Sequence, residues 1–379
     1  MTAILRCQSF YEFSGRVCKA TVRCLPVVDR RIFSGTLHFE RWRGAHSDDA
    51  GRSPELRTAL FISDKQWAHN VIEFSGLSKS SDGHEVVIFH INPGNGVLIE
   101  SLLDSCDHKQ IAWEPRKVFQ DYLKSLAELY ETKFAYCSRS FANDGQLKTF
   151  DKLISNNGTT DDARYHAKIV GNVPEMYSFI PKLAVSLGGF SNFRLCQFGI
   201  IEPILIVSGT EYRMMTEAEH FWQKSRHART SVYELFLRTE LLKTVPLSAF
   251  NHAKHFLLKS TTFDYDRENF YVVRLSLRKD IDSVCSREEI VGIILLLGII
   301  NNKKAQRVIP QMEHLCPDIG LTLLELGISM MDRFCDIPLN MWPEIYRAVT
   351  TSRQFSCSAL YHIFQRKGQT FGIILQSYQ

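Results

Sequence analysis

An acid, an amide and a guanidinium recur at helical spacing in the segment TEAEHFWQKSRHA, residues 216–228. Glu219, Gln223 and Arg226 lie at positions i, i+4 and i+7, so a helix would place all three on one face. An acid, an amide and a guanidinium on one stripe are unusual for a buried apolar face. Trp222 lies on the adjoining stripe, where packing is the simpler interpretation.

The same residues also fit a plain helix start. Thr216 followed by Glu219 three positions later is a capping-box pattern, in which the glutamate accepts a hydrogen bond from a free backbone N–H. A small-residue loop ending in Ser191-Asn192-Phe193 precedes this segment, within GGFSNFRLCQF at residues 188–198. The local sequence leaves both interpretations open.

Taken together, the loop and the segment resemble the NADAR or YbiA-like family over about residues 175–340. The shared pattern is an SNF loop, a hairpin with glycine and tyrosine, and then Thr-x-x-Glu-His-x-x-Gln, carried here by Ser191, Asn192, Phe193, Gly209, Tyr212, Thr216, Glu219, His220 and Gln223. The resemblance implies an N-glycosidase that acts on riboflavin-pathway intermediates or on ADP-ribose conjugates. It also implies that Glu219 lies in the active site and that the SNF loop shapes the pocket.

The implied chemistry suits these residue types. Cleavage of a ribosyl C1–N bond builds positive charge on the sugar, and a carboxylate stabilises that charge in the transition state. We therefore expect a hydrolase of the N-glycosidic bond in an ADP-ribosyl or ribosyl-phosphate compound, with ADP-ribosylated nucleobases among the candidates. The resemblance extends more faintly to Arg274 and Asp332. The predicted catalytic residues are Glu219 and Asp332, and the predicted substrate-binding residues are Ser191, Asn192, Phe193, Trp222, Gln223, Arg226 and Arg274.

Several positions depart from the family pattern. Arg226 stands where the family has a lysine, and Cys335 and Asp336 stand where it has tryptophan and glycine. Loss of that tryptophan removes a flat surface on which a base could stack. These departures favour an alternative, a catalytically impaired pseudoenzyme that binds ADP-ribose or a nucleotide and acts as an interaction protein. A further alternative is a structural protein without a ligand, in which Glu219 is only a helix cap.

Composition narrows the class of protein. The chain has 379 residues, 45% hydrophobic and 23% charged, with a formal net charge of +4, which gives no support to a strongly basic nucleic-acid binder. The 10 cysteines form no Cys-x-x-Cys pair, and His252 with His255 lacks further ligands nearby. We therefore expect no metal and no cofactor. Scattered thiols and the lack of a signal peptide predict a soluble protein in the cytoplasm or nucleus, with no membrane partner.

Hydrophobic patterns predict two different halves. Strands are expected near the N-terminus and at residues 86–91, followed by a turn at Pro93-Gly94-Asn95-Gly96 and a helix over about 118–134. The polar stretch 138–162 is the best domain boundary. Beyond it we expect a hairpin at Ser208-Gly209. Helices are then expected at 217–229, 231–243, 247–259, 267–284, 288–300, 303–315 and 320–334.

These elements predict an α+β fold. A mixed β/α domain of unassigned role (1–160) would precede a mostly helical YbiA-like domain with a small hairpin (170–340) and a C-terminal helical or tail segment (341–379). The apolar run IVGIILLLGII at 290–300 is too short to cross a bilayer and reads as a buried helix.

Overall fold

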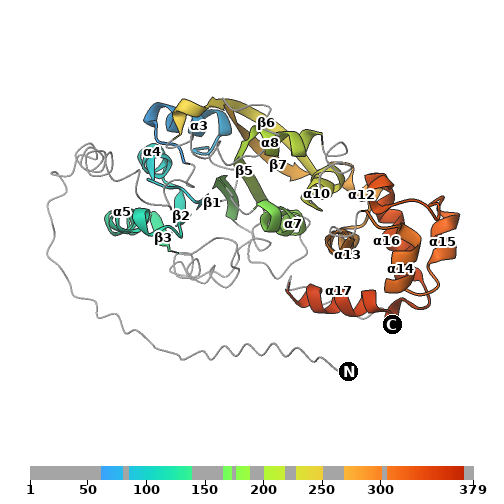
Figure 1. Cartoon of the computed structure of the whole chain (residues 1–379). Helices are drawn as coiled ribbons and strands as arrows, with labels where there is room; N and C mark the ends of the chain where they lie inside the picture. Colours follow the sequence, from blue (N-terminus) through green and yellow to red (C-terminus); the bar gives the residue numbers. More distant parts are fainter. Residues whose placement is uncertain are drawn as a thin grey trace, which may run out of the picture. The chain divides into compact units, whose positions relative to one another are not determined.

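A single seven-stranded sheet organises the part of the chain that the computed structural model describes, namely residues 61–79, 85–138, 165–172, 176–187, 200–217, 228–250, 269–300 and 305–370. The strand order is β3-β2-β1-β4-β5-β7-β6 (Figure 1). Strands β1 to β5 run parallel, and β7 runs antiparallel to both of its neighbours. The strands are β1 (Glu85–Ile91), β2 (Lys109–Trp113), β3 (Phe134–Cys137), β4 (Tyr165–Gly171), β5 (Ile200–Ser208), β6 (Leu237–Pro246) and β7 (Asn269–Leu277).

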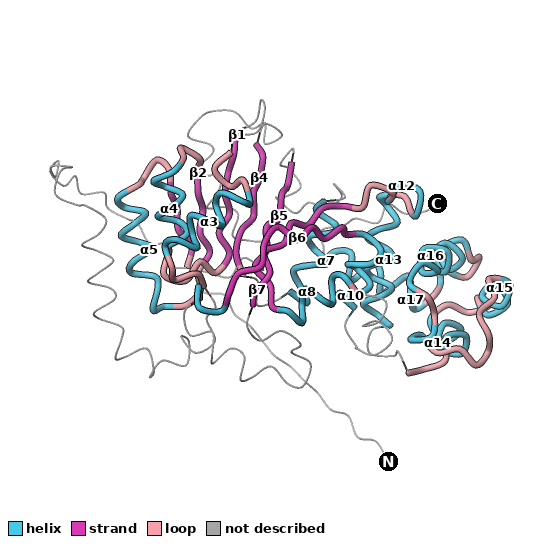
Figure 2. The backbone as a smooth tube through the Cα atoms, turned by 90° about the horizontal axis from the view of Figure 1, so that it is seen from above, coloured by secondary structure: helices cyan, strands magenta, loops and turns pink. Residues whose placement is uncertain are grey.

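Helices cover both faces of this sheet. Figure 2 shows α3, α4 and α5 on one side of the strands and α7, α8 and α10 on the other. Burial on both faces explains why β1 reads as a continuous apolar run, EVVIFHI, in which every residue after Glu85 is buried. The helices are α3 (Lys65–Ser75), α4 (Val97–Ser105), α5 (Lys117–Leu129), α7 (Met176–Leu187), α8 (Gly209–Thr216) and α10 (Ala228–Phe236).

The strand order contains a reversal point between β1 and β4. From β1 the chain proceeds outward through β2 to β3, and it then returns to the other side of β1 as β4. In open sheets of this doubly wound, Rossmann-like kind, ligands bind at the carboxyl ends of the strands where the order reverses. The fold therefore singles out the ends of β1 and β4 before any side chain is considered.

The predicted fold, an α+β protein with a mostly helical YbiA-like domain, is wrong. Residues 237–243 and 269–277, expected within helices, lie in β6 and β7. In β7 the run NFYVVRLSL is β-branched and aromatic and buries Phe270, Val272 and Val273 in the sheet. The sheet takes strands from both sides of the expected boundary near residue 160. The polar segment chosen for that boundary lies outside the described residues, so the division into domains stays a prediction.

The predicted hairpin at Ser208-Gly209 is also wrong, because a helix begins there. The Ser208 hydroxyl caps α8 by accepting a hydrogen bond from the Glu211 N–H at 3.3 Å. Thr216, expected as a helix start, is the last residue of α8, and its hydroxyl donates to the Tyr212 carbonyl. Ser208 and Gly209, which suggested a turn, therefore begin a helix after β5.

A helical layer follows the last strand and shares the core of the sheet. Helix α13 contacts α7 and α10 as well as α16 and α17. Its run of apolar residues is buried, as predicted for 290–300. No helix within the described ranges is long and apolar enough to cross a membrane. The remaining elements are α12 (Ile281–Val284), α13 (Arg287–Ile300), α14 (Val308–Leu315), α15 (Gly320–Glu325), α16 (Trp342–Thr351), α17 (Ala359–Thr370) and the 3-10 helices η5 (Leu247–Ala249), η7 (Phe334–Asp336), η8 (Leu339–Met341) and η9 (Phe355–Cys357).

Candidate functional site

A glycine-containing turn joins β1 to α4 at the reversal point. Gly94 (φ 65) and Gly96 (φ 76) both adopt the left-handed conformation, and Gly96 is the N-cap of α4. A Cβ on Gly94 would lie 2.2 Å from Cγ of Phe61. Glycine at position 94 therefore meets two demands, a positive φ and the close approach of an aromatic ring.

A buried carboxylate lies beside this turn. Glu114 follows β2 directly and is fully buried. Its Oε2 accepts a hydrogen bond from the Gly94 N–H at 3.0 Å. Arg116 holds the same carboxylate bidentately, with Nε 2.6 Å from Oε1 and Nη2 2.6 Å from Oε2, and its backbone N–H adds a bond to Oε1 at 3.1 Å. These four bonds use the acceptor positions that a carboxylate offers.

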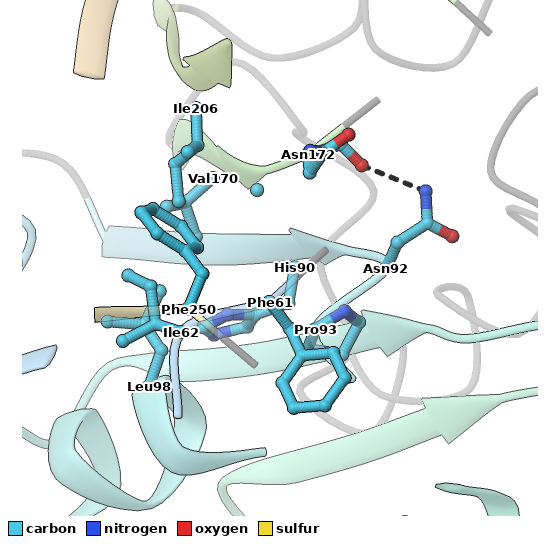
Figure 3. Close-up of a pocket in the computed structure, with 11 residues that line it drawn as sticks. Phe61, Ile62, His90, Asn92, Pro93, Leu98, Val170, Asn172, Ile206 and Phe250 are labelled. Atoms are coloured by element: carbon cyan, nitrogen blue, oxygen red, sulfur yellow. Dashed lines mark hydrogen bonds between the residues drawn. The ribbon is translucent and has the colours of Figure 1, made fainter. Parts of the chain in front are cut away.

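The ends of β1 and β4 are tied together by backbone and amide contacts. Asn92 donates its side-chain Nδ2 hydrogen to the carbonyl of Asn172 at 2.9 Å (Figure 3). Gly171 precedes Asn172 with φ 140, and a Cβ there would lie 2.1 Å from the Ile91 carbonyl oxygen. The two strand ends therefore approach more closely than any other residue type would allow.

A small cavity lies beneath these strand ends. It measures about 20 Å³, which is room for one water molecule and far below the roughly 300 Å³ of a small-molecule site. Its lining is mostly apolar, with His90, Asn92 and Asn172 as the polar members. Figure 3 shows Phe61, which lies before α3, and Phe250, which follows η5, among the side chains that line it. Among the residues that the structure describes, this cavity is therefore too small for a cofactor.

His90 is the buried polar group of this cavity wall. Its Nε2 is 2.9 Å from Oε1 of Gln110, and Nδ1 has no hydrogen-bond partner among the described residues. Burial lowers the pKa of His90 to about 4, although the Gln110 contact raises it. The imidazole is therefore neutral at physiological pH.

The first turn of α4 carries a second carboxyl group, that of Glu100. It accepts a hydrogen bond from the Tyr122 hydroxyl, and Lys65 lies 4.0 Å away. Burial raises the pKa of Glu100 to about 7, against the lowering effect of Lys65. The first turn of α4, next to the glycine turn, thus carries an acidic side chain.

The glycine turn and Glu114 form a pattern that the sequence contained. An apolar strand, Gly94-x-Gly96, a helix and an acidic residue about 20 positions further on are the marks of a nucleoside-binding βαβ unit. Glu114 follows Gly94 by that interval. The sequence predicted the strand and the turn but did not connect them to Glu114.

Most of the predicted site residues lie outside the described ranges, namely Ser191, Asn192, Phe193, Glu219, Trp222, Gln223 and Arg226. Two are described. Arg274 in β7 pairs its Nε with Glu202 at 2.6 Å and its Nη1 with Glu240 at 3.1 Å. Asp332 accepts a hydrogen bond from the Ser329 N–H in a turn after α15. These contacts explain both residues without a ligand, and the roles predicted for the set stay predictions.

Comparisons with known proteins give structural similarity alone. Neither a family model nor a curated protein matches the sequence. The 23S rRNA methyltransferase ErmE is 13% identical over 76% of this chain and 98% of its own, with a TM-score of 0.41. A precorrin-6y C5,15-methyltransferase from Geobacter metallireducens GS-15 is 11% identical over 57% of this chain and 90% of its own, with a TM-score of 0.32. TYW2 of P. horikoshii, in complex with MeSAdo, is 16% identical over 55% of this chain and 62% of its own, with a TM-score of 0.28.

These findings correct the expected family. The resemblance to the NADAR or YbiA-like family is wrong, because the segment assigned to it supplies β5, β7 and β6 of a Rossmann-like sheet. The predicted N-glycosidase activity and the ADP-ribose or ribosyl-phosphate partner are wrong with it. The same correction applies to the pseudoenzyme alternative. Since the TM-scores lie under 0.5, function must be inferred from the site itself.

Proposed function

We propose that this chain is a methyltransferase whose Rossmann-like sheet binds S-adenosylmethionine at the carboxyl ends of β1, β2 and β4. The observation that carries the proposal is the fully buried Glu114 carboxylate beside the Gly94 turn at the reversal point of the sheet. A carboxylate in this place binds the ribose hydroxyls of a nucleoside. When bound, S-adenosylmethionine supplies an electrophilic methyl group on a sulfonium centre.

The turn suits a nucleoside without a pyrophosphate better than a dinucleotide. Dinucleotide sites need a third glycine for close helix packing, and Ile99 occupies that position here. They also place the pyrophosphate at the helix N-terminus, where this chain has Glu100 in the first turn. A carboxyl group there opposes a dianion and tolerates a cationic sulfonium. Both differences favour the methyl donor.

The Glu114 carboxylate suits the ribose of such a cofactor, but in this structure Arg116 donates hydrogen bonds to it. Glu114 would hold the ribose once Arg116 turns away, since its acceptor positions are all filled. The Asn172 amide, at the end of β4, would face the methyl acceptor. The binding-competent state therefore requires local opening, and the affinity is reduced by the fraction of molecules that are closed.

Calorimetry with S-adenosylmethionine and S-adenosylhomocysteine tests this proposal. Glu114→Gln should weaken binding about 10- to 100-fold, because hydrogen bonds to a charged acceptor contribute roughly 1.5–3 kcal/mol. Arg116→Gln should strengthen it, since the carboxylate is freed for the ribose. The two substitutions should change the affinity in opposite directions. This distinguishes an effect on binding from an effect on folding, because a misfolded variant does not gain affinity. Glu128→Gln, an exposed change on α5, is the matched control and should match the wild type.

A dinucleotide completes the experiment. Neither the wild type nor any variant should bind NAD, because Ile99 replaces the third glycine and Glu100 opposes the pyrophosphate. Tight NAD binding, or equal affinities of wild type and Glu114→Gln for the methyl donor, would contradict the proposal.

A further inference from the structure

The side chain of Asn92 spans the crevice at the reversal point of the sheet. Asn92 is the first residue after β1, and its amide donates to the carbonyl of Asn172, the first residue after β4. β1 and β4 are neighbouring strands in register, with Ile91 paired to Gly171. The bond therefore joins the two carboxyl ends between which ligands of such sheets enter (Figure 3).

The backbone at Asn92 adopts the left-handed conformation. Among the described residues, Asn92 (φ 51) and Asp318 (φ 65) are the non-glycine residues with positive φ. Glycine adopts this conformation freely, and asparagine and aspartate are among the L-residues that tolerate it best. Gly94 and Gly96, two and four positions later, also have positive φ and carry no side chain. Asn92 is thus the left-handed position of this turn that carries a side chain.

The side chain has a clear structural use at this position. Besides the bond to Asn172, the Asn92 backbone N–H donates to the Trp113 carbonyl at 2.9 Å, which fixes the turn over β2. The amide arm is then held over the small cavity that Asn92 and Asn172 line. A ligand that enters between β1 and β4 must displace it.

We propose that Asn92 is a latch: its hydrogen bond to Asn172 keeps the cofactor crevice closed, and the cofactor enters only in molecules in which this bond is open. The inference rests on the proposed binding of S-adenosylmethionine and adds how access to that site is controlled.

The test compares Asn92→Gly with Asp318→Gly, using S-adenosylhomocysteine and calorimetry on the full chain. Both substitutions relieve a positive-φ backbone, but Asp318 precedes α15, away from the turn. Asn92→Gly should bind about 3- to 10-fold more tightly than the wild type, the range expected for one neutral hydrogen bond. Asp318→Gly should bind like the wild type. Asn92→Asp, which keeps the size of the side chain but replaces the donor by an acceptor, should also bind more tightly.

Each outcome decides between two proposals. A gain in Asn92→Gly and Asn92→Asp with no gain in Asp318→Gly supports the latch. Binding by the wild type with equal affinity in all variants overturns the latch and leaves the methyl-donor proposal standing. Absence of binding in every protein, at equal thermal stability, overturns both, since an opened crevice would still refuse the ligand.

Discussion

The contact between Gly94 and the Phe61 ring allows a quantitative test of how the glycine turn is built. Gly94→Ala introduces two separate costs. A Cβ at φ 65 costs about 1–2 kcal/mol in backbone conformation. Its position 2.2 Å from Phe61 Cγ adds about 1–3 kcal/mol of overpacking. We expect Gly94→Ala to lower the free energy of unfolding by about 2–5 kcal/mol.

The double variant separates these two costs. Phe61 is 4% exposed and packs edge-on against Phe119, with ring centroids 5.0 Å apart, so Phe61→Ala alone should cost about 3–5 kcal/mol. In the Phe61→Ala background the added methyl of Gly94→Ala has no ring to meet. The double variant should therefore be more stable than the sum of the single effects predicts, by about 1–3 kcal/mol.

Urea unfolding followed by tryptophan fluorescence and circular dichroism measures this coupling. Gly76→Ala is the matched control, because Gly76 has φ 67 but its Cβ would meet only the Lys79 side chain at 3.5 Å. It should cost only the backbone term and show no coupling to Phe61→Ala. Additivity of the Gly94 and Phe61 changes within about 0.5 kcal/mol would refute the steric reasoning.

Three further predictions concern residues of β1, β4 and α4 around the glycine turn. Gly171→Ala should destabilise the chain by about 3 kcal/mol in urea unfolding, because its Cβ would lie 2.1 Å from the Ile91 carbonyl oxygen at a φ of 140; a stable variant would contradict the close approach of β1 and β4. The lowered pKa of His90, about 4 against 6.5 in the unfolded chain, means that the unfolded state binds more protons between these values. Stability should therefore fall by about 3 kcal/mol as pH drops from 7 to 4, and His90→Gln should lose this share of the acid sensitivity. The raised pKa of Glu100, about 7, has the opposite sign, since the folded state then holds the proton more tightly. Relative to Glu100→Gln, the wild type should lose stability as pH rises from about 4.5 to 7, which parallel urea titrations would detect.

The elements that local pattern decides were predictable from the sequence. β1 is a continuous apolar run, α5 has apolar residues at helical spacing, and α13 is apolar from Ile290 onward, so each has one stable way to be buried. β6 differs, because LRTELLKTVP contains good helix formers and much of it is exposed. Only its pairing with β7 makes it a strand, and that pairing joins residues far apart in the chain.

The candidate site was unpredictable for a similar reason. Gly94 and Glu114 are both visible in the sequence, but their contact depends on β2 lying next to β1. The role of Arg116, which fills the acceptor positions of Glu114, requires the side-chain geometry. A resemblance built on short spaced motifs at 191–223 could not reveal that the strands around it complete a sheet begun a hundred residues earlier.

The place of β7 in the sheet has a consequence for synthesis on the ribosome. β7 lies between β5 and β6, although it follows β6 in the chain. During translation β5 and β6 therefore emerge before the strand with which both pair. Until residues 269–277 appear, the growing sheet presents the bare edge of β5, and such edges recruit other chains. A nascent chain that pauses in translation before β7 would therefore be especially prone to aggregate. A chaperone that covers the edge of β5 would protect it.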